Sequence, residues 1–117
     1  MDGSLIKTSN LKEWLALNGY SQDNLNSVGK YGNSAIMKAS REANLSIVDE
    51  LISLNVDLNV KNIDGNSALW NACFGDSYAC FEALVSAGIN IDSQNVNNVT
   101  SLMYCASAGK DILLSFL

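Results

Sequence analysis

Few side chains in this chain of 117 residues are suited to catalysis. The sequence contains no histidine, so no serine or cysteine can be paired with the imidazole that often activates such a nucleophile. Cys73, Cys80 and Cys105 fall on the apolar pattern of predicted helices, which indicates small buried side chains rather than a disulfide or a metal site. Zinc would need further thiolate ligands that are absent. We therefore expect no catalytic residue, no metal site and no cofactor.

Two other groupings could in principle do chemistry, a lysine between glycines and a pair of acids. Residues 28–32 read VGKYG, but they lack the GxxxxGK[ST] spacing and the preceding strand of a phosphate-binding loop. Asp49 and Glu50 are adjacent, so a helix would place them about 100° apart, where they cannot hold one substrate atom together. A solvated helix face explains the two acids better. What remains for function is the protein surface.

A repeat with a period of 33 residues organises the chain, and it positions that surface. Gly32, Gly65 and Asn98 are spaced by this period. Other sets follow in the same register: Ser34, Ser67 and Thr100; Ile36, Leu69 and Leu102; Ala39, Ala72 and Cys105; Leu51, Leu84 and Leu117. The hydroxyl groups of Ser34, Ser67 and Thr100 are suited to cap a helix. Each period reads as a turn, a short helix, a second helix and a loop, and this order resembles the ankyrin repeat.

The resemblance implies an all-α fold, a helical repeat solenoid of helix-turn-helix pairs joined by hairpin-like loops. The whole chain, 1–117, is expected to be one domain. It divides into a degenerate capping helix and loop at 10–28, repeats at 29–61 and 62–94, and an incomplete repeat at 95–117. The family's usual Thr-Pro-Leu-His reads SAIM, SALW and TSLM here, so the Pro and the His are missing.

Each full repeat is expected to contain two helices, at about 35–42 and 45–53 and at about 68–75 and 78–86. Asn44 and Ser77 are suited to cap the second helices, and Asn55 and Gly88, which tolerate positive φ, are suited to end them. Five positions of each second helix are predicted to be core: Leu45, Ile47, Val48, Leu51 and Ile52, and then Tyr78, Cys80, Phe81, Leu84 and Val85.

Before the repeats, residues 10–18 read as a short amphipathic helix. Asn10, with Glu13 three residues later, is expected to cap its start, and Asn18-Gly19 to end it. Its sequence aligns with 48–55 at an offset of 37 rather than 33. This predicts the second helix of a degenerate repeat, followed by a loop that is four residues longer than in the other repeats.

Charge and hydropathy restrict the class of partner. The net charge of −5 and the pI near 4.4 argue against DNA as a partner. No apolar run is long enough to span a bilayer, and the first residues lack the basic and apolar regions of a secretion signal. We expect a cytoplasmic protein that binds neither nucleic acid nor membrane.

In ankyrin arrays the contact residues typically come from the turn tips and the inner faces of the first helices, which form a concave face. The resemblance therefore implies a partner-binding surface made of Lys30, Tyr31, Asn33, Lys38, Arg41, Lys61, Ile63, Asp64, Asn66, Asn71, Phe74, Val96, Asn97 and Tyr104. Four of the seven basic residues belong to this set and gather at one end of it. Together with the aromatic residues of the set they would suit a partner protein that offers acidic groups beside an apolar patch.

The resemblance thus implies a non-catalytic protein–protein interaction module. Three alternatives stay open from the sequence: a small inhibitor or immunity-type protein that blocks an enzyme or toxin, a terminal fragment of a larger ankyrin array, and self-association through the apolar residues Phe116 and Leu117. For any single surface residue, ordinary solubilising charge is an equally good explanation.

Overall fold

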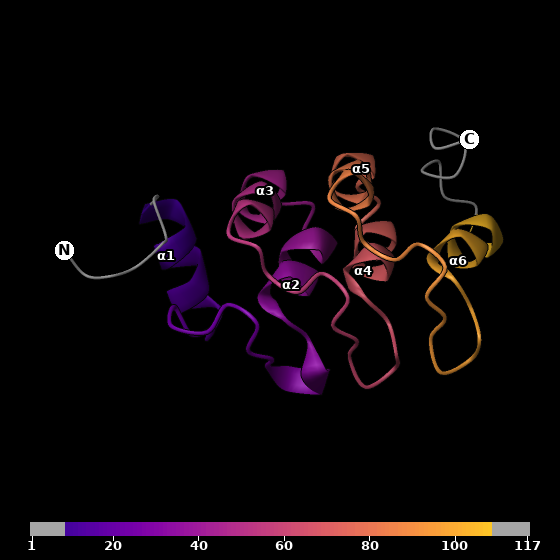
Figure 1. Ribbon diagram of the computed structural model, residues 1–117, viewed down its shortest axis with the longest axis horizontal. Helices are drawn as coiled ribbons and strands as arrows, with labels where there is room; N and C mark the ends of the chain where they lie inside the picture. Colours follow the sequence, from indigo (N-terminus) through magenta and orange to yellow (C-terminus); the bar gives the residue numbers. More distant parts are fainter. Residues whose placement is uncertain (1–8, 109–117) are drawn as a thin grey trace.

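The computed structural model describes residues 9–108, which form six α-helices and a short 3-10 turn (Figure 1). In chain order these are α1 (Ser9–Leu17), η1 (Lys30–Gly32), α2 (Ala35–Arg41), α3 (Leu45–Ser53), α4 (Ala68–Phe74), α5 (Tyr78–Ser86) and α6 (Ser101–Ser107). The four helices expected in the two full repeats end within a residue of their predicted bounds, so the fold is the expected all-α repeat. Phe116 and Leu117, the residues expected to mediate self-association, lie outside the described residues.

The helices pack in two layers. In the inner layer α2 contacts α4 and α4 contacts α6, and in the outer layer α1 contacts α3 and α3 contacts α5. Figure 1 shows the helix pairs side by side, with the long turns projecting together from the same edge. Because each pair contacts only its neighbours, the period in the sequence becomes a linear stack in space.

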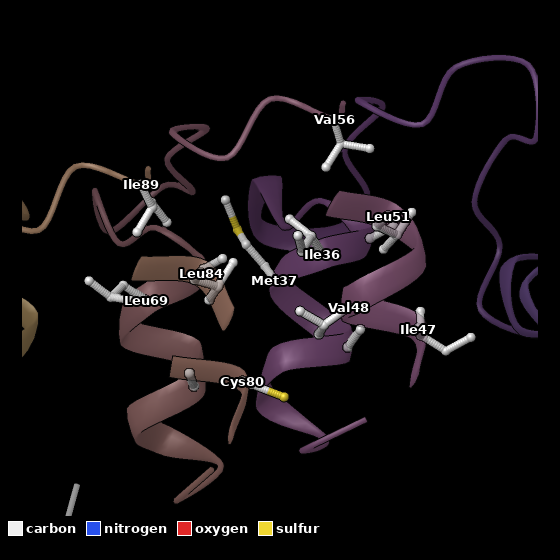
Figure 2. Packing of buried hydrophobic residues seen from close by; sticks show 14 of the residues in the cluster. Ile36, Met37, Ile47, Val48, Leu51, Val56, Leu69, Cys80, Leu84 and Ile89 are labelled. Atoms are coloured by element: carbon white, nitrogen blue, oxygen red, sulfur yellow. The ribbon is translucent and has the colours of Figure 1, made fainter. Parts of the chain in front are cut away.

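The core fills the space within and between the helix pairs. In Figure 2 Met37 of α2 extends toward the α4–α5 pair, where Leu69 and Leu84 lie. All three are fully buried. Since interiors of this kind are closely packed, the stack resists sliding of one pair past the next.

The prediction for the core of the second helices is partly wrong. Their three middle positions are buried, as expected: Ile47, Val48 and Leu51 in α3, and Cys80, Phe81 and Leu84 in α5. Leu45 and Tyr78 instead keep 36% and 37% of their surface exposed. Each is the first residue of its helix, and helical side chains lean back toward the N-terminus, so these two lean beyond the packed neighbours. Ile52 and Val85 are only partly buried.

Side-chain caps fix most helix starts. Ser67, Thr100, Asn44 and Ser77 each accept a hydrogen bond from a backbone N–H in the first turn of the helix that follows. Ser34 does not, contrary to the prediction: its hydroxyl group is buried and has no hydrogen-bond partner.

The start of α1 also differs from the prediction, whereas its end is confirmed. Asn10 lies inside the helix, because α1 already begins at Ser9. The helix ends at Leu17, and Gly19 follows it with a φ of +75°; the backbone N–H of Tyr20 donates to the carbonyl oxygen of Leu15 at 2.9 Å. This is the usual left-handed end of a helix.

The 33-residue register extends further back than the sequence indicates. Asn26 accepts a hydrogen bond from the N–H of Asp57 at 2.7 Å, and Asn59 accepts the equivalent bond from Asn90 at 2.9 Å. The helix end at Gly19 lies 36 residues before its counterpart Asn55, which also has positive φ. The first loop is therefore three residues longer than the others, not four.

Candidate functional site

One asparagine organises each of the second and third turn tips. The side-chain oxygen of Asn62 accepts from the N–H groups of Asp64 and Asn66, both at 3.0 Å. Its amide nitrogen donates to the side-chain oxygen of Asn33 in the preceding turn at 2.9 Å. Asn95 makes the same bonds one period later, with its amide donating to Asn66 at 3.0 Å. Each turn is thereby fixed to the one before it.

The backbones of successive tips are also hydrogen-bonded. Ile63 donates its N–H to the carbonyl oxygen of Tyr31, and Val96 donates to that of Asp64, each at 3.0 Å. A side chain at Gly65 would bring its Cβ to 2.8 Å from the Val96 nitrogen, so this close approach requires glycine. The result is an exposed apolar row in which Tyr31, Ile63 and Val96 keep 58%, 66% and 65% of their surface accessible.

A second row joins the C-terminal ends of the inner helices. The guanidinium carbon of Arg41 lies 5.1 Å from the ring centroid of Phe74. The rings of Phe74 and Tyr104 meet edge to face, with their centroids 4.8 Å apart. A Cβ on Gly75 would overlap the carbonyl oxygen of Arg41, which shows how closely α2 and α4 approach at this end.

A pocket of about 500 Å³ lies where α1, the first turn and the inner layer meet. We call it the end pocket. It is lined by Leu17, Asn18, Tyr20, Gly29, Lys30, Tyr31, Asn33, Lys38, Arg41 and Asn71. Six of these residues belong to the partner-binding surface expected from the sequence: five come from the first full repeat and the sixth, Asn71, comes from the second.

The lining of the end pocket is positively charged, with three basic side chains and no acid. Lys38 also pairs with Glu42, with the Nζ and Oε2 atoms 3.4 Å apart. The indole nitrogen of Trp14 donates to the other oxygen of Glu42 at 3.1 Å. The ammonium group of Lys30 lies 5.1 Å from the ring centroid of Tyr31. Both lysines and Arg41 remain at least partly exposed.

Tyr20 anchors the wall that α1 contributes to the pocket. Its ring stacks on that of Trp14, with the centroids 5.9 Å apart and the planes 4° from parallel. Its hydroxyl group donates to the carbonyl oxygens of Asn33 at 3.1 Å and Ser34 at 3.3 Å. Burial raises the pKa of this hydroxyl, and the nearby carboxylate of Glu42 raises the pKa further. The hydroxyl group of Tyr20 is therefore protonated at neutral pH, and its hydrogen bonds hold this wall of the pocket in place.

Two residues expected on the binding surface are buried, and their expected exposure is corrected here. Asn66 is 7% exposed because its side chain accepts the bond from Asn95, and Asn71 is 2% exposed because its amide donates to the carbonyl oxygen of Ser67. Lys61 is exposed, but its ammonium group donates to the carbonyl oxygen of Gln94 at 3.2 Å. These three side chains form hydrogen bonds within the protein, so fewer residues of the expected binding surface are available to a partner.

The remaining members of the set are accessible to different degrees. Ile63, Asp64, Val96 and Asn97 are exposed along the turn tips, and Phe74 and Tyr104 are partly buried in the inner layer. Sequence reasoning missed Leu17, Asn18 and Tyr20, because these residues precede the first full repeat. The signal that could have found them is the extra length of the loop after α1.

The cysteines offer no reactive group on this surface. Cys73, Cys80 and Cys105 form no disulfide, and each has no exposed surface. Burial raises the pKa of Cys80, partly opposed by its hydrogen bond with Ser77 and assisted by the charge of Asp49. Within residues 9–108 no group of three or more acids and cysteines is placed to hold a metal ion. No helix in that part of the chain is both long and apolar enough to cross a membrane.

Comparison with known families gives one result. The profile of a family described as "Ankyrin repeats (3 copies)" matches residues 6–95 and, in a second alignment, residues 36–117. The two alignments overlap and together reach from before α1 to the last residue. No curated protein matches the chain.

Proposed function

Because this chain belongs to the ankyrin repeat family, we propose that it binds a partner protein through its concave face and turn tips, without catalysing a reaction. Repeats of this family generally act as protein–protein interaction modules and are typically non-catalytic. We take the concave face to be the side of α2, α4 and α6 that faces away from the outer helices, where Arg41, Phe74 and Tyr104 remain at least partly exposed. The partner itself has to be inferred from the surface chemistry of this chain.

The observation that carries the proposal is the exposed apolar row at the turn tips. Ile63 and Val96 each leave about two thirds of their surface in water. Their backbones are nevertheless held by hydrogen bonds to the preceding turn. A rigid apolar row loses little conformational entropy when a partner covers it, so the burial of its surface contributes to affinity. Nothing in the packing of the described residues requires these side chains to be apolar.

The charges beside this row favour an acidic partner surface. Lys30, Lys38 and Arg41 lie at one end of the concave face, although the chain as a whole carries a charge of −5. Acidic groups beside apolar ones would complement both the row and these cations. A cytoplasmic setting fits the proposal, because the three cysteines form no disulfide and a reducing compartment keeps thiols in that state.

The test compares what three immobilised proteins capture from a cell extract: the wild type, the double variant Ile63→Asp/Val96→Asp, and Tyr78→Asp. Tyr78 is a matched control, because it is also an exposed apolar side chain but lies on the outer helix α5. We expect the wild type and the control to retain the same partner and the double variant to lose it. Equal capture by all three folded proteins would contradict binding through the turn tips and concave face.

A further inference from the structure

We propose that the end pocket holds a short acidic segment of the partner protein. A carboxylate of this segment lies among Lys30, Lys38 and Arg41, and a neighbouring apolar side chain packs on Leu17. This inference rests on the proposed function and makes it more specific, because it names the chemistry that one end of the binding surface recognises.

Charge is the first argument. The five basic residues of the described part of the chain are Lys12, Lys30, Lys38, Arg41 and Lys61, and three of them line the end pocket. No acid lines it, although the chain has 12 acids against seven bases. The pocket is thus a positive site on a negative protein, although one of its lysines, Lys38, is paired with Glu42. A long polyanion would be repelled by the rest of the surface, whereas a short acidic segment meets only the pocket.

The second argument is the apolar wall. Leu17 keeps 86% of its surface exposed, more than any other large apolar side chain in the described residues. It is the last residue of α1 and stands beside the basic side chains of the pocket. In the bound segment, a carboxylate would pair with the basic side chains of the pocket. An apolar side chain next to that carboxylate would then cover Leu17.

The third argument is that the pocket is already formed. Tyr20, from the same wall, is held by its stacking on Trp14 and by two hydrogen bonds to the backbone of the first full repeat. These contacts fix the wall of the pocket against the first full repeat. A volume of about 500 Å³ accommodates a few side chains, which suits a segment rather than a whole domain face.

The experiment is a selection of random linear peptides displayed on phage against three immobilised proteins. These are the wild type, the triple variant Lys30→Glu/Lys38→Glu/Arg41→Glu, and Lys61→Glu, which reverses one charge outside the pocket. We expect the wild type and Lys61→Glu to enrich peptides that combine Asp or Glu with Leu or Phe. The triple variant should lose this enrichment. Circular dichroism shows whether it is folded, and Lys30→Gln/Lys38→Gln provides a milder variant if it is not.

Affinities of a selected peptide refine the test. Each single reversal, Lys30→Glu or Lys38→Glu, should weaken binding about fivefold or more, and added salt should weaken binding to the wild type. Leu17→Ser should remove the preference for an apolar residue and keep the preference for acids. Selection without acidic peptides, or acidic enrichment that persists in a folded triple variant, would overturn the inference. If capture of the partner still depended on Ile63 and Val96, the proposed function would stand without this inference. If capture did not depend on them either, both the inference and the proposed function would be contradicted.

Discussion

The guanidinium group of Arg41 lies over the ring of Phe74, with its Cζ atom 5.1 Å from the ring centroid, and so joins the C-terminal ends of α2 and α4. The same ring meets the edge of Tyr104 from α6. Phe74 is therefore shared by three successive helices of the inner layer, and it contributes to stability as well as to the surface.

Phe74→Ala should lower the free energy of unfolding by about 2 kcal/mol, because a partly buried aromatic side chain and its edge contact are lost. Urea denaturation followed by circular dichroism measures this. A double-mutant cycle with Arg41→Ala should give a coupling of about 0.5 kcal/mol, as for other exposed cation–π pairs. A coupling of zero would mean that the two groups do not interact in solution.

Asn62→Ala should be destabilising by about 1 to 3 kcal/mol, because two backbone N–H groups and the side chain of Asn33 lose their partner. Asn97→Ala is the matched control, since that side chain is exposed at the next turn tip, and its effect should stay within about 0.5 kcal/mol. Chemical denaturation measures the free energy of unfolding of both variants and of the wild type. Equal effects would show that Asn62 does not organise its turn.

Gly75→Ala should destabilise the protein by about 1 to 3 kcal/mol, since the new methyl group would force apart the backbones of α2 and α4. The midpoint of thermal unfolding reports the change. Gly29→Ala serves as the control, because a Cβ there would have no atom nearer than 3.7 Å. Identical midpoints for the two variants would argue against the close helix approach.

Tyr20→Phe should cost about 1 kcal/mol near pH 8, where the hydroxyl group is neutral and donates to the backbone. The folded-state pKa of Tyr20 is raised above 10, its ordinary value, so this stabilisation is complete below pH 10 and is lost as the pH rises through the folded-state pKa. The difference in stability between wild type and variant should therefore shrink above pH 10. Urea titrations at several pH values measure it, and a difference that does not change with pH would contradict the raised pKa.

The periodic part of the fold could be predicted from the sequence, because each repeat sets the same local conditions. Positive φ is required at Gly32, Gly65 and Asn98, and the structure has it at all three. Caps such as Ser77 and apolar positions such as Leu84 recur with the same role in space. Periodicity predicts these features because a nearest-neighbour stack uses each sequence position in the same way every time.

The candidate site was harder to predict because it depends on departures from the period. The resemblance placed Asn66 and Asn71 on the surface, but side-chain hydrogen bonds bury both. Leu17 and Tyr20 line the end pocket, but they precede the first full repeat and have no place in its pattern. A position-by-position comparison of repeats gives no information on such a segment, and the length of a loop alone does not fix its path.

The hydrogen bonds between turn tips have a consequence for how the molecule could grow. Asn62 donates to Asn33, and Asn95 donates to Asn66, so the middle tip, which carries Asn62 and Asn66, both donates and accepts this bond. A duplicated copy of residues 62–94 inserted after Gln94 would find a matching acceptor behind it and a matching donor ahead. No hydrogen bond between turn tips would have to be redesigned. Lengthening by gene duplication is therefore permitted by the geometry of the turns themselves.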